Sequence, residues 1–270
     1  MHKMNNNPFY SIIVVCLNPG EKLKTTLDSI LVQTFQNYEI IVKDGLSKDG
    51  AAEKYKAYGD ERIKLYQEAD TGIYDAMNQA VSKSKGRFIY FLNCGDVLWD
   101  EQVLFNLKSE IDKNGQAEIY YGNFFEAVTK QEVFSNPHLD RFACYRHLPC
   151  HQACFYQREL LSSHPFLTKY KVRADYEHFL WCLLDKKVKA LYVPLLIVGY
   201  EGAGFSETKE NRRRSAREHK EIVNKYMSKT EILRYRLIMF LTLAPLRTAL
   251  ARSKFTADFY NRIRKLIYHK

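Results

Sequence analysis

The sequence predicts an α/β protein with a mostly parallel, Rossmann-like sheet flanked by helices, followed by a basic helical tail. Short apolar, β-branched runs alternate with segments of helical spacing over residues 10–92. This alternation indicates β-α-β-α-β-α-β order, which is typical of parallel strands joined by right-handed crossovers. The chain has 270 residues, of which 46% are hydrophobic, so it is long enough to bury a large core.

The first unit is the clearest. Residues 10–17 form a continuous β-branched run of the kind found in strands buried on both faces, and the run ends at Asn18, Pro19 and Gly20. Residues 21–34 then place Leu23, Leu27, Ile30 and Leu31 at helical spacing. We expect a strand, a turn and a helix.

Three further strands follow. Residues 38–43 end at a turn, residues 44–50, that holds two Asp and two Gly; residues 63–66 lead into residues 70–78; and the apolar run 88–92 ends at Asn93-Cys94-Gly95-Asp96. Open α/β sheets bind ligands beyond the carboxyl ends of their strands. A turn carboxylate there can hold a hard cation that in turn holds phosphate, although Asn-x-Gly-Asp by itself is also an ordinary turn.

Together these segments resemble the inverting glycosyltransferases of family 2, which have the GT-A fold. The resemblance covers residues 9–205, and residues 70–78 with 91–96 resemble a branch that builds bacterial surface polysaccharides. It rests on the strand ending at Asn18, Asp44-Gly45-x-Ser47-x-Asp49-Gly50, residues 72–78 followed by Lys85-Gly86, Asn93-x-Gly95-Asp96, and Ala174-Asp175-Tyr176-Glu177.

The resemblance implies a set of residues for the nucleotide-sugar donor. Asp44 would accept a hydrogen bond from the nucleobase or the ribose, with Asn18, Gly45 and Asn93 beside it; the alternative is that Asp44 only caps a helix or a turn. Asp70, Asp75 and Asn78 would shape the donor pocket. Asp75 and Asn78 are three residues apart on an expected helix, so a solvated surface position is the alternative.

The resemblance also implies a divalent cation, Mg²⁺ or Mn²⁺, held by Asp96 against the donor diphosphate. The family often has two or three carboxylates here, whereas this chain has Asn93 and Gly95. Mg²⁺ tolerates such a site, because it keeps several waters and needs only one or two carboxylates plus substrate phosphates.

An inverting displacement needs a carboxylate that takes the proton of the acceptor hydroxyl as an oxocarbenium-like centre forms. Asp175 is the expected general base and Glu177 the second candidate; the alternative is that Asp175 only stabilises a helix N-terminus. His151 and Gln152 precede a strand-like run, residues 153–156. We expect them to line the acceptor side, with a structural hydrogen-bonding role as the alternative.

The cysteines indicate reduced thiols. Cys144, His147, Cys150, His151 and Cys154 lie close together, but they lack the C-x₂-C spacing of a zinc knuckle. No signal peptide and no run of about 20 apolar residues is seen, so the sequence favours a cytoplasmic protein.

The tail carries the net charge of the chain. Residues 205–270 contain 17 Lys and Arg against 6 Asp and Glu, whereas the whole chain has a formal net charge of +10. We therefore expect two parts: residues 1–204 form the GT-A catalytic domain, and residues 205–270 form basic amphipathic helices that lie on an anionic membrane surface. Packing on the catalytic domain and nucleic-acid binding are the alternatives, and we expect no nucleic-acid partner.

The sequence thus predicts a metal-assisted transferase, peripheral at the inner face of the cell membrane. It would move a sugar from a nucleotide diphosphate, UDP being favoured, to a hydroxyl of a lipid-linked glycan. A dehydrogenase is excluded because Asn18-Pro19-Gly20 is not a dinucleotide-binding glycine fingerprint. A nucleotidyltransferase on a similar scaffold and a non-catalytic basic membrane-binding module remain as alternatives.

Overall fold

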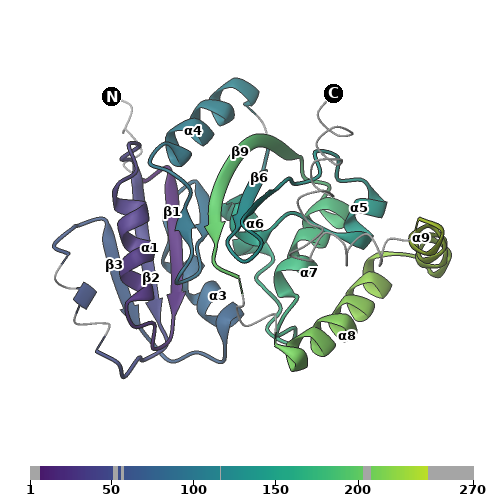
Figure 1. Ribbon diagram of the computed structural model, residues 1–270, viewed down its shortest axis with the longest axis horizontal. Helices are drawn as coiled ribbons and strands as arrows, with labels where there is room; N and C mark the ends of the chain where they lie inside the picture. Colours follow the sequence, from purple (N-terminus) through teal and green to yellow (C-terminus); the bar gives the residue numbers. More distant parts are fainter. Residues whose placement is uncertain (1–6, 51–53, 56–57, 116, 203–207, 243–270) are drawn as a thin grey trace.

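The computed structural model describes residues 7–50, 54–55, 58–115, 117–202 and 208–242. It shows one mixed sheet with helices packed on both faces (Figure 1). The strands are β1 (Tyr10–Cys16), β2 (Tyr38–Asp44), β3 (Ile63–Gln67), β4 (Phe88–Phe91), β5 (Val97–Leu98), β6 (Ile119–Glu126), β7 (Gln131–Val133), β8 (Cys154–Gln157) and β9 (Ala190–Tyr200). The helices are α1 (Lys22–Leu31), α3 (Ile73–Lys83), α4 (Val103–Asn114), α5 (Arg141–Arg146), the 3₁₀ turn η1 (His151–Ala153), α6 (Arg158–Ser163), α7 (Ala174–Leu180), the π-helical turn η2 (Trp181–Asp185), α8 (Lys209–Tyr226) and α9 (Lys229–Leu241).

The amino-terminal half of the sheet has the predicted β-α-β order. Its strands lie in the order β3-β2-β1-β4 and all pair in parallel. The chain passes from β1 to β2 and β3 on one side, and then crosses to β4 on the other side of β1. The carboxyl ends of β1 and β4 therefore meet at a topological switch point, where α/β sheets bind ligands.

The other half of the sheet is mixed, which corrects the expectation of a mostly parallel sheet. From β4 the order continues β8-β6-β9-β5, with β7 beside β6. β8 runs antiparallel to both β4 and β6, and β5 runs antiparallel to β9, while β6 and β9 are parallel. The alternation that indicated parallel strands stops after β4, so the sequence pattern carried no signal for these reversals.

The central strands are buried on both faces, as their continuous apolar runs predict. On β1, Ile12 and Val14 pack with residues of α1 and α4, whereas Ile13 and Val15 pack on the opposite face with residues of α3, α7 and α8. This two-sided packing fixes the sheet and the turns that follow its strands.

The described part of the tail packs on the sheet domain. Ile222 and Val223 of α8 and Ile232 and Tyr235 of α9 belong to the same core as α3 and α7. Figure 1 shows α8 lying along α7, with α9 at the edge of the molecule. Residues 208–242 therefore share a hydrophobic core with residues 7–202, and the predicted helices beyond residue 242 lie outside the described residues.

The outer side of α9 is apolar and exposed: Leu233, Leu237, Phe240 and Leu241 have relative exposures between 55 and 74%. Among the described helices, none is both long and apolar enough to cross a membrane.

Candidate functional site

A cavity of about 1050 Å³ lies beyond the carboxyl ends of β1 and β4, at the switch point of the sheet. We call the lining residues of the sheet turns and the start of α3 the sheet-turn wall; they include Asn18, Lys22, residues 70–77, Asn93 and Asp96. The other wall consists of lining residues before and in α7, namely Thr168, Lys171, Val172 and Asp175, with Arg214 of α8. The chain after β9 meets the sheet-turn wall, because Glu201 bonds to both Lys22 and Asp96. Eight of the predicted site residues line the cavity: Asn18, Asp70, Asp75, Asn93, Asp96, His151, Gln152 and Asp175.

Asn18 connects the turn after β1 to the turn after β2. Its backbone N–H donates to Ser47 Oγ at 2.7 Å, and its side-chain oxygen accepts from the backbone N–H of Lys48 at 2.8 Å. The residue adopts a φ of 48°, in the left-handed region that Asn tolerates better than most residues. Asn18 thus shapes the rim of the cavity through two fixed bonds.

Asp44 does not reach the cavity. Its side chain is fully buried and Oδ1 accepts from both the backbone N–H of Ser47, at 2.9 Å, and the Ser47 hydroxyl, at 2.5 Å. The adjacent Gly45 also lies behind the lining, and a Cβ there would sit 2.9 Å from Asp70 Oδ2. In this structure Asp44 holds the turn after β2, and its expected contact with the nucleobase or the ribose stays a prediction.

Of the three residues around α3 that were expected to shape the donor pocket, Asp70 and Asp75 line the cavity. Asp70 pairs with the buried Lys43 at 3.0 Å, and Asp75 accepts from Thr71 N at 2.8 Å and from Thr71 Oγ1 at 3.1 Å. The Thr71 bond lowers the pKa of Asp75. Asn78 instead makes a reciprocal pair of 2.9 Å bonds with the backbone of Phe166, outside the lining, so the structure corrects its expected donor contact to a structural one.

Gln152 connects the two polar residues of the turn after β4. Its Oε1 accepts from the backbone N–H of Asn93 at 2.6 Å, and its Nε2 donates to Asp96 Oδ2 at 2.6 Å. Asp96 Oδ1 accepts from Glu201 N at 2.7 Å. Burial raises the pKa of Asp96 above its usual value, against the effect of these bonds. Gln152 therefore lines the cavity and also holds the expected metal ligand in place.

The polar groups around Asp96 fit a hard divalent cation. Asn93 Oδ1 is a buried oxygen that accepts no hydrogen bond from any described residue, and Asp96 has lone pairs beyond its two bonds. Glu201 lies close enough to raise the Asp96 pKa further. No cluster of three His, Cys, Asp or Glu side chains with metal-ligand geometry occurs in the described part of the chain. Mg²⁺ or Mn²⁺ would accordingly depend on substrate phosphates to complete its coordination.

Asp175 enters the cavity from the first turn of α7, where the helix dipole favours a negative charge. The hydroxyl of Tyr74, on α3, donates to Asp175 Oδ1 at 2.7 Å. Burial first, and the Asp175 charge second, raise the Tyr74 pKa well above its usual value, so Tyr74 stays a donor. No described residue donates to Asp175 Oδ2, which leaves that oxygen open to a ligand.

Glu177 points away from the cavity and is fully buried. It accepts from Lys225 Nζ at 2.6 Å and Tyr226 Oη at 2.5 Å, and it lies 3.0 Å from His164 Nε2. Burial opposes ionisation of Glu177, but these hydrogen bonds outweigh it and lower its pKa. The carboxylate anchors α8 to α7, so we do not retain Glu177 as a candidate base.

His151 forms part of the cavity wall beside Asp175. Its ring stacks on Phe91 with centroids 5.0 Å apart, and burial lowers its pKa, which favours the neutral imidazole. Nδ1 lies 3.5 Å from the Tyr156 hydroxyl, whereas Nε2 is buried without a partner among the described residues. A neutral ring with one free nitrogen can bind a substrate hydroxyl as donor or acceptor.

Sequence reasoning missed several lining residues. Lys22 pairs with Glu201 at 2.6 Å, although the two residues are 179 positions apart, and Lys171 and Arg214 enter from the other wall. Tyr74 lies in the segment 72–78 that carries the family resemblance, but no role was predicted for it. Lys22, Lys171 and Arg214 reach the cavity only through tertiary structure, so the local sequence pattern could not indicate them.

Comparisons with known proteins point to one family. A family model described as glycosyl transferase family 2 matches residues 11–162. A "PGL/p-HBAD biosynthesis glycosyltransferase" of Mycobacterium bovis is 30% identical over 206 residues, which are 74% of this chain and 80% of the relative. The "UDP-Glc:alpha-D-GlcNAc-diphosphoundecaprenol beta-1,3-glucosyltransferase WfgD" of Escherichia coli is 29% identical over 192 residues, covering 67% of this chain and 72% of the relative.

Solved structures share the fold at lower identity. S. aureus TarS 1-349 in complex with UDP superposes with a TM-score of 0.65 at 16% identity, covering 82% of this chain and 68% of that one. In another structure of the same TarS fragment the match spans 60% of that chain. The mannosyltransferase PcManGT from Pyrobaculum calidifontis, in complex with GDP-Man and Mn²⁺, superposes with a TM-score of 0.63 at 17% identity, covering 96% of this chain and 81% of that one.

Proposed function

The chain belongs to glycosyl transferase family 2, and from that membership we propose that it transfers a sugar, with inversion, from a UDP-sugar to a hydroxyl of a lipid-linked glycan. The family match and the glycosyltransferase relatives establish the enzyme class. One observation carries the proposed mechanism: Asp175 presents an open oxygen to the same cavity that Asp96, Gln152 and Asn93 line.

Asp175 acts as the general base in this mechanism. Its free Oδ2 takes the proton from the acceptor hydroxyl, whose oxygen forms the new bond to the anomeric carbon of the donor sugar. The bond from that carbon to the donor phosphate breaks with its electron pair, and the nucleoside diphosphate leaves. Tyr74 holds the carboxylate in one orientation, and the neutral His151 offers a hydrogen bond to a sugar hydroxyl nearby.

The donor diphosphate lies at the sheet-turn wall in this proposal. Carboxylates outnumber basic side chains around the cavity, five against three: Asp70, Asp75, Asp96, Asp175 and Glu201 face Lys22, Lys171 and Arg214. A dianionic diphosphate would be repelled without further positive charge, which supports a cation held by Asp96 and Asn93. When bound, Mg²⁺ or Mn²⁺ would offset the charge that develops on the leaving group.

We also propose that the outer face of α9 rests on the inner surface of an anionic membrane, which would bring the enzyme to a lipid-linked acceptor. Leu233, Leu237 and Phe240 recur at helical spacing on that face, and the exposed Arg234 and Arg236 flank it on either side. An apolar stripe bordered by arginines is typical of helices lying in the headgroup plane. Ile232 and Tyr235, on the opposite face of α9, pack on the protein and fix the orientation.

The test identifies the product that is released from the donor and measures the effect of one substitution on activity. The full chain is incubated with a panel of UDP-, GDP- and dTDP-sugars, a lipid-linked acceptor, and Mg²⁺ or Mn²⁺. We expect release of nucleoside diphosphate; release of pyrophosphate would indicate a nucleotidyltransferase instead. Asp175→Asn should lower kcat by roughly 10²-fold or more, the scale for loss of a general base, while nucleotide binding persists.

Asp185→Asn is the matched control, because Asp185 is an exposed carboxylate just after the same helix and outside the cavity. It should retain wild-type activity. An Asp175→Asn variant as active as wild type would overturn the assignment of the base.

A further inference from the structure

Two basic side chains, Lys171 and Arg214, line the same wall of the cavity as Asp175. Lys171 is exposed and forms no ion pair with any described residue. Arg214 meets Glu210 at 3.3 Å on the same helix, but Glu210 is 81% exposed, and such surface pairs contribute little. Lys22 pairs with Glu201 at 2.6 Å in a pair that is also exposed, and Glu201 N donates to Asp96, so Lys22 lies on the Asp96 side of the cavity.

A buried carboxylate fixes this wall. Glu218 of α8 is 8% exposed and accepts from the backbone N–H groups of Lys171, Val172 and Arg173 at 2.9, 3.0 and 2.9 Å. Arg173 Nε also donates to Ser215 Oγ, next to Arg214, at 2.7 Å. The loop that carries Lys171 and the turn that carries Arg214 are therefore held together, immediately before the helix that presents Asp175.

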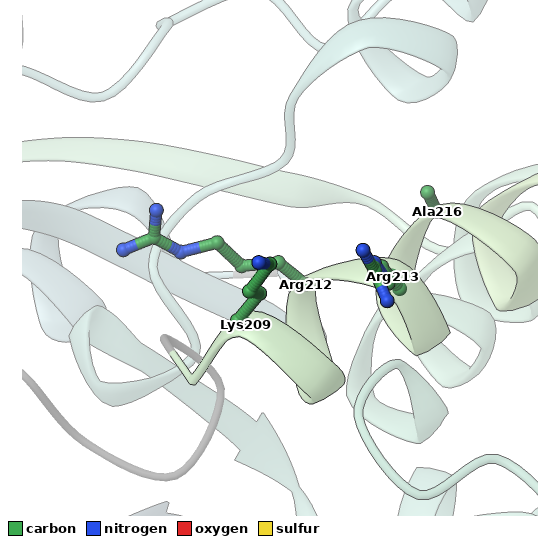
Figure 2. A pocket seen from close by; sticks show the side chains of 4 residues that line it. All are labelled: Lys209, Arg212, Arg213 and Ala216. Atoms are coloured by element: carbon green, nitrogen blue, oxygen red, sulfur yellow. The ribbon is translucent and has the colours of Figure 1, made fainter.

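Both oxygens of Glu218 bind backbone N–H groups, and among the described residues Glu218 forms no ion pair with the Lys171 side chain. The positive charge continues along α8 outside the cavity. A shallow hollow of about 540 Å³ is lined by Lys209, Arg212, Arg213 and Ala216, and Figure 2 shows their side chains along the first turns of the helix.

We propose that Lys171 and Arg214 form a phosphate-binding subsite for the acceptor, which must carry a phosphate diester or diphosphate next to its reacting sugar. This inference rests on the proposed function. The two cations share a wall with the base that receives the acceptor proton, whereas the donor diphosphate is assigned to the Asp96 wall. Lys and Arg bind phosphate oxygens through charge-assisted hydrogen bonds, which are stronger than neutral ones.

The test compares two acceptors with the same sugar. One carries it on a short alkyl chain through a diphosphate, and the other carries it as a neutral alkyl glycoside. For Lys171→Gln and for Arg214→Gln, the ratio of kcat/KM for the charged acceptor to kcat/KM for the neutral one should fall about tenfold each. The preference of the wild type for the charged acceptor should also weaken with added salt.

Lys220→Gln provides the control, because Lys220 is an exposed cation on the same helix that does not line the cavity. It should keep the wild-type ratio. Calorimetry with UDP and Mn²⁺ separates the two phosphate sources: a loss of UDP affinity in Lys171→Gln or Arg214→Gln would assign the cations to the donor and overturn the inference. An equal loss with both acceptors would also overturn it.

Failure of the proposed function would give a different result. The wild type and both Gln variants would then transfer sugar to neither acceptor from any nucleotide sugar.

Discussion

Tyr74 Oη lies 2.7 Å from Asp175 Oδ1 and thereby joins the first turns of α3 and α7 across the cavity. The same hydroxyl lies 3.0 Å from the backbone oxygen of Val172, so Tyr74 also contacts the loop that leads into α7. Desolvation keeps the hydroxyl protonated, and the bond fixes which carboxylate oxygen remains open. This contact makes Tyr74 a positioning residue for the proposed base.

Tyr74→Phe should lower kcat about tenfold, because it removes a hydrogen bond to a charged group without removing the base. KM for the nucleotide sugar should stay near the wild-type value. Steady-state kinetics with both substrates varied separates the effect on kcat from the effect on KM. Tyr66→Phe serves as the control for loss of a tyrosine hydroxyl outside the cavity, and a rise in donor KM with unchanged kcat in Tyr74→Phe would contradict the positioning role.

Gln152→Leu should weaken cation-dependent donor binding. The substitution removes both bonds that Gln152 makes, to Asn93 N and to Asp96 Oδ2, and leaves two buried polar groups unpaired at a cost of about 1–3 kcal/mol each. Calorimetry with UDP, with and without Mn²⁺, measures the effect, and Asp96→Asn provides the comparison. If UDP binding by both variants still responds to Mn²⁺ as in the wild type, the cation is held elsewhere.

The binding of the cation should also depend on pH. Because burial raises the pKa of Asp96, this carboxylate takes up a proton at a higher pH than an ordinary Asp. Cation-dependent UDP binding should therefore decline on acidification before most surface carboxylates are protonated. In Asp96→Asn that pH dependence should be absent.

Glu177→Gln should act on stability rather than on chemistry. The buried carboxylate accepts hydrogen bonds from Lys225, which is partly exposed, and from Tyr226, and losing the charged acceptor costs about 1.5–3 kcal/mol of unfolding free energy. The pKa of Glu177 is lowered in the folded protein, so its contribution is present above the unfolded value near 4.5 and is lost as pH falls through the folded pKa.

Denaturant unfolding of wild type and Glu177→Gln between pH 7 and pH 3 tests this point. The difference in unfolding free energy between wild type and Glu177→Gln should be largest near neutral pH and should decrease on acidification. Glu221→Gln is a suitable control, since Glu221 lies on α8, the helix of Lys225, and its pair with Lys169 is exposed on both sides. A folded Glu177→Gln protein with activity as low as that of Asp175→Asn would restore Glu177 as a candidate base.

The elements that the sequence predicted correctly are those fixed by local pattern. The strands β1, β2 and β4 and the turns after them follow from continuous β-branched runs and turn residues within about 20 positions. Asn18 and Asp96 reached the cavity because they lie in the turns after β1 and β4, and Asp175 because it lies in the first turn of α7. The antiparallel strand β8 could not be predicted from the same pattern, because its direction depends on pairing with β4 and β6.

The predicted site residues that do not line the cavity have partners elsewhere in the structure. Asp44 is taken by Ser47, three residues later, although a nucleobase was the expected partner. Glu177 is buried because Lys225 and Tyr226 arrive from α8, 48 and 49 positions away. The same helix brings Arg214 to the cavity. Charge and hydropathy of the tail indicated a membrane surface, and they held no information about which helix face packs inward.

The last prediction separates the packing role of the tail from its proposed membrane role. Ending the chain after residue 204 removes Ile222 and Val223 from the core and Glu218 from the loop before α7, so we expect this variant to lose cooperative folding. By contrast, Leu237→Glu with Phe240→Glu changes side chains that are 55 and 74% exposed. The double variant should unfold at the same denaturant concentration as wild type.

Sedimentation with anionic vesicles then tests the membrane role directly. Wild type should bind, and the double Glu variant should not bind even at low salt, because it loses apolar burial and adds repulsion from the anionic surface. Arg234→Gln with Arg236→Gln should bind more weakly and with less dependence on salt, since each cation near such a surface contributes about 1 kcal/mol. Equal vesicle binding by wild type and the double Glu variant would show that α9 serves only to pack against α5 and α8.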